Sequence, residues 1–397
     1  MTTSSTLPRK RLTGPLKRGL FHGFAGLTLA ALALNASAGA ALAQVPTLPP
    51  PPPPTFGSTF VVNTNTDTND GVCDTQHCTL REAINRANAN SSIFKLTDHI
   101  EFQLPIEQAL LIQLAAPLPT VTSPLTIDGR NQPTIVETVV FGQTVFWAVP
   151  HPGVVEIHGG SQAADALTVN TTATVSNLAL TGFSGTALEV NFTGTKTLDS
   201  LNVHNNAGTG VDLQGSNATL SNSNISANNP GVRLAGSQNV VSGNTITGNV
   251  RGVRVSGSND TLGGTSTAAR NVISGNTGSG VELAIGSGTR VIGSFIGTDA
   301  AGTAALPNTG NGITVFSTSS NTIGGPTQAE RNVISGNAQN GIFMVLGNSP
   351  TPGTVTVQGN FIGTTADGTT KLGNALSGVE VDGFTGTGAD DLSPQPS

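Results

Sequence analysis

Gly-Val pairs recur along the second half of the chain. The first three are separated by 21 residues each: Gly210-Val211, Gly231-Val232 and Gly252-Val253. The series continues at wider intervals with Gly280-Val281, Gly312-Ile313, Gly341-Ile342 and Gly378-Val379. The heptapeptide RNVISGN also occurs twice, at 270–276 and 331–337. This regularity predicts a repeat architecture in which each unit packs on its neighbours.

Within one unit, three short segments with apolar residues alternate with turn residues, as in NTIT (244–247), GVRV (252–255) and NVIS (271–274). Strands this short cannot build a hairpin sheet with long strands. They fit one coil of a β-solenoid, in which equivalent strands of successive coils stack in parallel about 4.8 Å apart. The 50 Gly residues and the absence of Tyr agree with short strands and tight turns. We therefore predict an all-β parallel β-helix.

An asparagine precedes each Gly-Val or Gly-Ile pair by three or four residues. Asn tolerates the left-handed conformation of a sharp corner, and stacked amides can hydrogen-bond from coil to coil. We predict a structural role for this series: Asn206, Asn228, Asn249, Asn276, Asn308, Asn337 and Asn374.

A helical segment at 78–90 is expected to cap the first coil, because the open end of a solenoid exposes core and backbone. Leu80, Ala83, Ile84 and Ala87 have the spacing of one apolar helix face. Thr79 and Glu82 form a predicted capping box, and Glu82 is placed to pair with Arg86 one turn later.

The chain has two cysteines, Cys73 and Cys78, just before this helix. In an exported protein we expect them to form a disulfide. A zinc site is the alternative, but three or four ligands are needed and His77 is the sole further candidate nearby. The segment DTNDGVCD (67–74) also resembles a calcium loop, although it is one residue short of that spacing. The prediction is a disulfide without a metal or another cofactor, with calcium as the alternative.

Residues 1–43 combine a basic start, an apolar run and small residues before the expected cleavage site, which is typical of a secretory signal peptide. Residues 44–56 form a proline-rich linker. Without the leader, 12 Lys and Arg oppose 23 Asp and Glu, which argues against nucleic acid as a partner. No later segment is apolar enough to span a membrane. We expect export to the cell surface or the medium, with the periplasm as the alternative.

The sequence CTLREAI (78–84) resembles the CSLREA motif of exported bacterial proteins, with Thr79 where that motif has Ser. Segments such as DHIEFQLP and NFIGTTADGT are similar to those that accompany the motif in right-handed parallel β-helix proteins of the pectin-lyase-like type. The resemblance covers about 58–384. It implies the β-helix fold and a scaffold that elsewhere carries polysaccharide lyases and hydrolases. We therefore expect a CSLREA cap with irregular first coils at 57–160, parallel β-helix repeats at 161–384 and a disordered tail at 385–397.

The outward position after each Gly-Val pair carries charge in four successive units: Asp212, Arg233, Arg254 and Glu282. We predict cross-strand ion pairs between Asp212 and Arg233 and between Arg254 and Glu282. A glycosidase needs two carboxyls about 5–9 Å apart, whereas Asp212 and Glu282 should lie three coils apart. Arg270 and Arg331 occupy matching repeat positions and are expected to brace the insertion loops.

No catalytic residue is therefore assigned. The sequence favours a non-catalytic surface or secreted repeat protein, with Asp212, Arg233, Arg254 and Glu282 as a ladder facing polysaccharides or cell-surface glycans. A polysaccharide lyase or glycoside hydrolase is the first alternative, and a structural spacer is the second. The oligomeric state stays open.

Overall fold

The computed structural model describes residues 57–90, 96–105, 110–131, 133–140, 143–150, 155–160, 164–316, 320–346 and 354–383. All of them belong to the second of two compact units, Pro54–Ser397. The predicted leader (1–43), linker (44–56) and tail (385–397) lie outside these residues.

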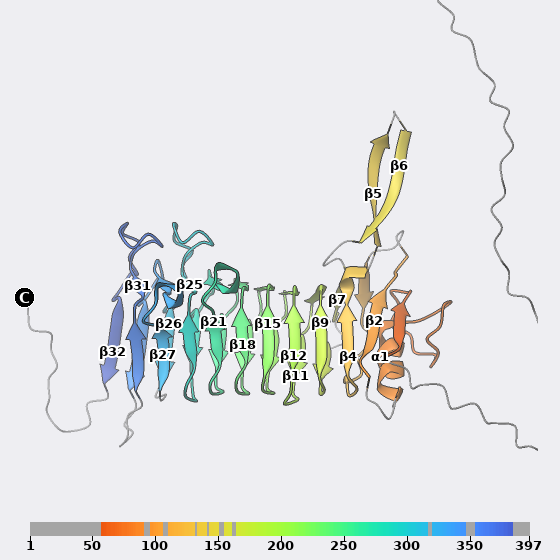
Figure 1. Cartoon of the computed structure of the whole chain (residues 1–397), viewed down its shortest axis with the longest axis horizontal. Coiled ribbons are helices and arrows are strands. Elements are labelled where there is room, and N and C mark those ends of the chain that lie inside the picture. Colours follow the sequence, from red (N-terminus) through yellow and green to blue (C-terminus); the bar gives the residue numbers. More distant parts are fainter. Residues whose placement is uncertain are drawn as a thin grey trace, which may run out of the picture. The chain divides into compact units, whose positions relative to one another are not determined.

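The described residues form three long sheets and one two-stranded sheet, and the strands within each long sheet pair in parallel with the next coil, as predicted. Figure 1 shows the strands of successive coils side by side. The first sheet has 11 strands. They are β1 (Thr59–Val62), β2 (Asp98–Phe102), β4 (Leu125–Asp128), β9 (Ala173–Ser176), β12 (Lys196–Asp199), β15 (Ala218–Ser221), β18 (Val240–Ser242), β21 (Thr261–Gly263), β24 (Arg290–Ile292), β27 (Asn321–Gly324) and β30 (Val355–Gln358).

The second sheet has ten strands and the third has nine. The second comprises β3 (Leu111–Gln113), β7 (Val155–His158), β10 (Leu178–Thr181), β13 (Asn202–His204), β16 (Asn224–Ser226), β19 (Thr245–Thr247), β22 (Val272–Ser274), β25 (Phe295–Ile296), β28 (Val333–Ile334) and β31 (Phe361–Ile362). The third comprises β8 (Leu167–Val169), β11 (Leu188–Val190), β14 (Val211–Leu213), β17 (Val232–Leu234), β20 (Val253–Val255), β23 (Val281–Leu283), β26 (Ile313–Phe316), β29 (Ile342–Leu346) and β32 (Val379–Gly383).

The first coils are irregular, because the third sheet begins only at β8. Between β4 and β7 the chain forms a 3₁₀ turn, η1 (Gly129–Asn131), and then an antiparallel pair, β5 (Pro133–Val140) and β6 (Gln143–Pro150). Two further 3₁₀ turns, η2 (Thr267–Ala269) and η3 (Gln328–Glu330), lie in the insertions that precede the two RNVISGN segments.

Aliphatic side chains of one strand position form a continuous column inside the coil. In the second sheet the register stacks Val203 on Ile225, Ile225 on Ile246 and Ile246 on Ile273. All four side chains are fully buried. Burying an aliphatic side chain of this size contributes about 1.5–3 kcal/mol, so the column is a main source of stability.

Asparagines line one corner of the coil as predicted. Each donates its side-chain amide to the Oδ1 of the next, over 2.8–3.1 Å. The series runs through Asn206, Asn228, Asn249, Asn276, Asn308, Asn337 and Asn374.

The predicted left-handed conformation of these asparagines is wrong. In several coils the residue just before the ladder asparagine has the positive φ instead, as at Asn205 (56°), Ala227 (54°), Gly248 (66°) and Gly275 (67°). The reason is geometric: the left-handed residue makes the corner, and the following asparagine can then point inward to bond the neighbouring coil.

The predicted cap helix is α1 (Leu80–Ala89), which contacts β1 and β2 at one end of the stack (Figure 1). Leu80, Ala83, Ile84 and Ala87 are buried, and the capping box of Thr79 with Glu82 is present. The predicted ion pair between Glu82 and Arg86 is wrong. Glu82 is turned into the protein, where its carboxylate accepts hydrogen bonds from the backbone N–H groups of Asp70 and Thr79.

Arg81 ties this cap to the first coils. Its guanidinium binds both carboxylate oxygens of Asp67, at 3.0 and 2.7 Å, and donates to the carbonyl oxygens of Ala116 and Pro117. Asp67 also accepts the N–H of Ala115. The arginine of the CTLREAI segment therefore joins three parts of the chain that are far apart in sequence.

Candidate functional site

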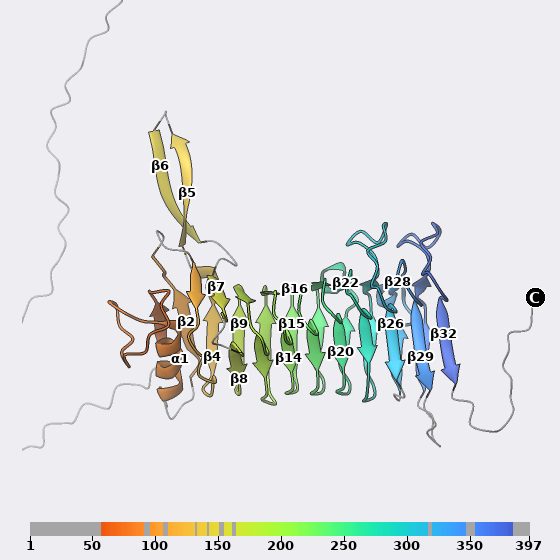
Figure 2. The same cartoon turned by 180° about the vertical axis from the view of Figure 1, so that it is seen from behind.

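The middle residues of the strands of the third sheet form a column, and Figure 2 shows these strands side by side. Each member is paired in register with the next. The column is Glu189, Asp212, Arg233, Arg254, Glu282, Thr314, Phe343 and Glu380. The four predicted ladder residues thus stand on four successive coils.

Both predicted ion pairs are present. Arg233 Nη1 lies 3.0 Å from Asp212 Oδ2, and Arg254 Nε lies 3.2 Å from Glu282 Oε1. A further cation was missed from sequence, because it comes from the turn before β20 and not from a strand. Arg251 Nε lies 2.9 Å from Glu282 Oε2, so Glu282 is held between two arginines.

A closer pair of carboxylates than Asp212 and Glu282 exists in this column. Glu189 and Asp212 are neighbours in register, and the Gln214 amide donates to both, at 2.5 and 3.1 Å. Burial raises the pKa of the Asp212 carboxyl, and the Arg233 guanidinium offsets part of that effect. The Asp212 side chain is only 3% exposed, so a bound substrate could not reach it without movement of its neighbours.

Beyond Arg254 the column opens into a groove of about 470 Å³. Its walls carry charged, amide and aromatic side chains: Arg251, Glu282, Asn311, Phe316, Gln339 and Phe343. Phe316, at the end of β26, is 38% exposed. The two phenylalanines come from adjacent coils, β26 and β29, and present rings beside hydrogen-bonding groups.

A second cavity, of about 610 Å³, lies beside the cap. It is lined by β1, the disulfide segment and the chain after β2, including Phe60, Leu104 and Pro105. Asp74 is the one ionisable side chain among the described residues that line it, and its carboxylate already accepts the N–H groups of Gln76 and His77. This cavity therefore offers fewer groups for recognition or catalysis than the groove on the third sheet.

Cys73 and Cys78 are joined in a disulfide. The acids of the calcium-like segment do not converge on one point: Asp67 binds Arg81, Asp74 caps its own turn, and Asp70 faces His77. Ca²⁺ requires six to eight oxygen ligands around the ion, so this segment is not arranged as a calcium loop.

Arg270 and Arg331 each stack on a phenylalanine of the next coil. Their guanidinium carbons lie 4.0 Å from the centre of the Phe295 ring and 4.1 Å from that of Phe361. Each also ends a 3₁₀ turn of an insertion, η2 or η3. These arginines therefore brace the insertions, as predicted.

A second asparagine column was missed. Asn244 donates to Asn271 Oδ1 at 3.2 Å, and Asn332 donates to Asn360 Oδ1 at 2.9 Å. All but Asn360 are fully or almost fully buried. Asn271 and Asn332 are the first asparagines of the two RNVISGN segments. The repetition of this heptapeptide could therefore have revealed the second asparagine column.

A family described as "Right handed beta helix region" matches residues 165–325. Together with the three parallel sheets, this match defines the chain as a right-handed β-helix repeat protein. No curated protein sequence matches it significantly. In the described part of the chain, no helix is long and apolar enough to cross a membrane.

Several solved structures are similar in overall form. The A-module of an Azotobacter vinelandii mannuronan C-5 epimerase, AlgE4, has 17% identity and a TM-score of 0.45, over 80% of this chain and 95% of that one. The pectate lyase Pel9A has 13% identity and a TM-score of 0.40, over 77% and 78%. An alginate lyase from a Paenibacillus species has 14% identity and a TM-score of 0.37, over 82% and 99%.

Proposed function

We propose that this chain is an exported, non-catalytic β-helix repeat protein of the CSLREA type, which binds acidic polysaccharide along the outer face of its third sheet. The resemblance of CTLREAI to the CSLREA motif and the signal-like segment at 1–43 support this assignment. The disulfide between Cys73 and Cys78 supports an oxidising compartment.

The groove on the third sheet is the observation that carries the proposal. Phe316 and Phe343 offer apolar ring faces on adjacent coils, which suit the C–H faces of sugar rings. The Gln339 amide lines the same groove and can bond hydroxyl groups, whereas Asn311 is buried there and already bonds Thr314 and Asn340. Pockets that combine apolar surface with a few fixed polar groups are typical ligand sites.

The arginines favour a ligand with carboxylate groups. Arg251 and Arg254 hold Glu282 through Nε, and within the described residues their terminal Nη groups have no hydrogen-bond partner. Their side chains are 45% and 46% exposed. A guanidinium with unused donors binds carboxylates well, so a uronate-containing polysaccharide fits better than a neutral one.

Binding can be measured by affinity electrophoresis and calorimetry with polyuronates and with neutral glucans. We expect polyuronate binding that weakens about tenfold, or about 1.4 kcal/mol, in Phe316→Ala and in Arg251→Gln. Phe192→Ala and Arg290→Gln are matched controls, because these residues have similar exposure (41% and 46%) but lie outside the groove. Equal binding by all four variants would contradict the proposed surface.

A second candidate, a polysaccharide lyase or hydrolase, is favoured by one observation. Glu189, Asp212 and Arg233 bring two carboxylates and a guanidinium together on three successive coils. Burial of Asp212 argues against it, because a catalytic acid must contact the reacting atoms.

A further inference from the structure

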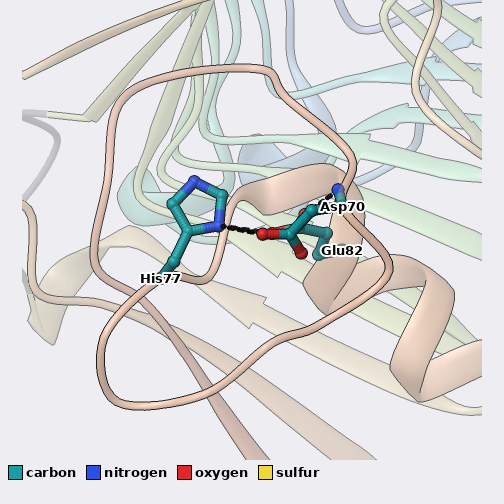
Figure 3. A group of neighbouring side chains, drawn as sticks. All are labelled: Asp70, His77 and Glu82. Atoms are coloured by element: carbon teal, nitrogen blue, oxygen red, sulfur yellow. Dashed lines mark hydrogen bonds and ion pairs between the residues drawn. The ribbon is translucent and has the colours of Figure 1, made fainter.

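Three side chains that bind metals in many proteins meet beside the disulfide segment: Asp70, His77 and Glu82 (Figure 3). Their donor atoms all lie within 4.8 Å of one another. We propose that this cluster is a zinc site that fastens the loop at 70–77 to the cap helix. It is independent of the polysaccharide groove.

The distances from His77 Nδ1 to the two carboxylates fit a shared metal better than a hydrogen bond, and all three donors lie within 4.8 Å of one another. His77 Nδ1 lies 3.4 Å from Asp70 Oδ2 and 3.4 Å from Glu82 Oε2. Charge-assisted N–H···O bonds are shorter, about 2.7–2.9 Å. In a tetrahedron with bonds of about 2.0–2.1 Å to zinc, neighbouring donors are separated by about 3.3–3.4 Å.

The environment of the imidazole points the same way. His77 Nδ1 is a buried atom without a hydrogen-bond partner, although it faces two carboxylates. The other ring nitrogen, Nε2, lies 3.2 Å from Thr68 Oγ1. If Nε2–H donates to that hydroxyl, the lone pair of Nδ1 points at the carboxylates, and a cation between them resolves the repulsion. Histidines that bind zinc are typically oriented by such a bond to the second nitrogen.

Backbone groups hold both carboxylates in position. Asp70 N–H donates to Glu82 Oε1 at 2.8 Å, and Thr79 N–H donates to Glu82 Oε2 at 2.9 Å. The Val72 N–H donates a hydrogen bond to Asp70 Oδ1, and the other carboxylate oxygen, Oδ2, faces His77. Each carboxylate oxygen has a second lone pair for a metal. Glu82 is 1% exposed and Asp70 is 57% exposed, so the site is anchored on one side and open to solvent on the other.

The donor types select zinc over calcium. An imidazole with two carboxylates suits a four-coordinate ion whose fourth ligand is water, whereas Ca²⁺ takes six to eight oxygens. The nearby Asp67 and Asp74 are bound elsewhere and cannot complete an oxygen cage.

The test is zinc titration of the full, oxidised chain against a chromophoric chelator, with thermal unfolding at saturating zinc in parallel. We expect one zinc per chain and a rise in Tm. His77→Gln and Asp70→Asn should lose at least about tenfold in affinity together with the Tm rise, and Thr68→Val should lose about 10–100-fold in affinity. Cobalt(II) should give the visible absorption of a tetrahedral site.

Two controls separate this site from adventitious binding. His99→Gln removes an exposed histidine on β2, and Glu101→Gln changes an acid of the same strand; neither residue belongs to the cluster. Both should bind zinc like the unmodified chain. Loss of binding in His99→Gln, or a Tm unchanged by zinc in the unmodified chain, would overturn the proposal.

Discussion

Asn228 donates its side-chain amide to Asn249 Oδ1 over 3.0 Å, and the same oxygen accepts the backbone N–H of Asn228. Asn249 in turn donates to Asn276 and to the carbonyl oxygen of Ile225. One buried amide therefore satisfies groups on both neighbouring coils.

Asn249→Ala should accordingly destabilise the protein by about 3 kcal/mol, because it leaves several buried polar groups without partners. Asn224→Ala is the matched control, since Asn224 is exposed and should change stability by less than about 0.5 kcal/mol. Urea unfolding followed by circular dichroism measures both. Equal stability of the two variants would show that the asparagine column contributes nothing beyond its place in the turn.

Arg81→Leu should detach the cap. The substitution removes the bidentate contact to Asp67 and leaves that carboxylate, which is 3% exposed, without its cation. Breaking a buried pair in this way costs about 3–5 kcal/mol. Hydrogen exchange should show faster exchange in α1 and β1 than in β16 or β19. Uniform exchange along the coils would contradict a role confined to the cap.

The buried carboxyl of Asp260 should make the stability of the protein depend on pH. It is fully buried, its Oδ2 has no hydrogen-bond partner, and burial raises its pKa to about 6. The folded state therefore holds this proton more tightly than the unfolded state, so stability should fall as pH rises from about 4 through 6. Asp260→Asn should remove this component and stabilise the protein at pH 8 by about 1–2 kcal/mol.

Thermal unfolding of both proteins at pH 5 and pH 8 checks this prediction. Comparison with Asp260→Asn separates the contribution of this carboxyl from that of all other titratable groups. If the difference between the two proteins is the same at both pH values, ionisation of Asp260 does not contribute.

The repeat made the third sheet predictable. Each Gly-Val pair marks the start of a strand, and so the register from Asp212 to Glu282 followed directly from the sequence. The corner was misplaced by one residue, because in most coils the residue before the ladder asparagine is itself an Asn or a Gly that suits a left-handed turn, and only the backbone distinguishes the two positions.

Contacts made by residues outside the regular strand positions were not predictable in the same way. Arg251 reaches Glu282 from a turn, and Phe316 reaches the groove from a strand end. The cluster of Asp70, His77 and Glu82 depends on how the disulfide segment folds back on the helix. In sequence, Glu82 already had a role in the capping box, and its second role at the cluster is visible only in three dimensions.

We propose that the third sheet binds acidic polysaccharide without cleaving it. The most direct measurement incubates the folded chain with polyuronates, with and without calcium, and follows both retention of the polymer and the appearance of reducing ends and unsaturated products. We predict retention without products. Products that disappear in Asp212→Asn would contradict binding without cleavage and would make Glu189, Asp212 and Arg233 an active site.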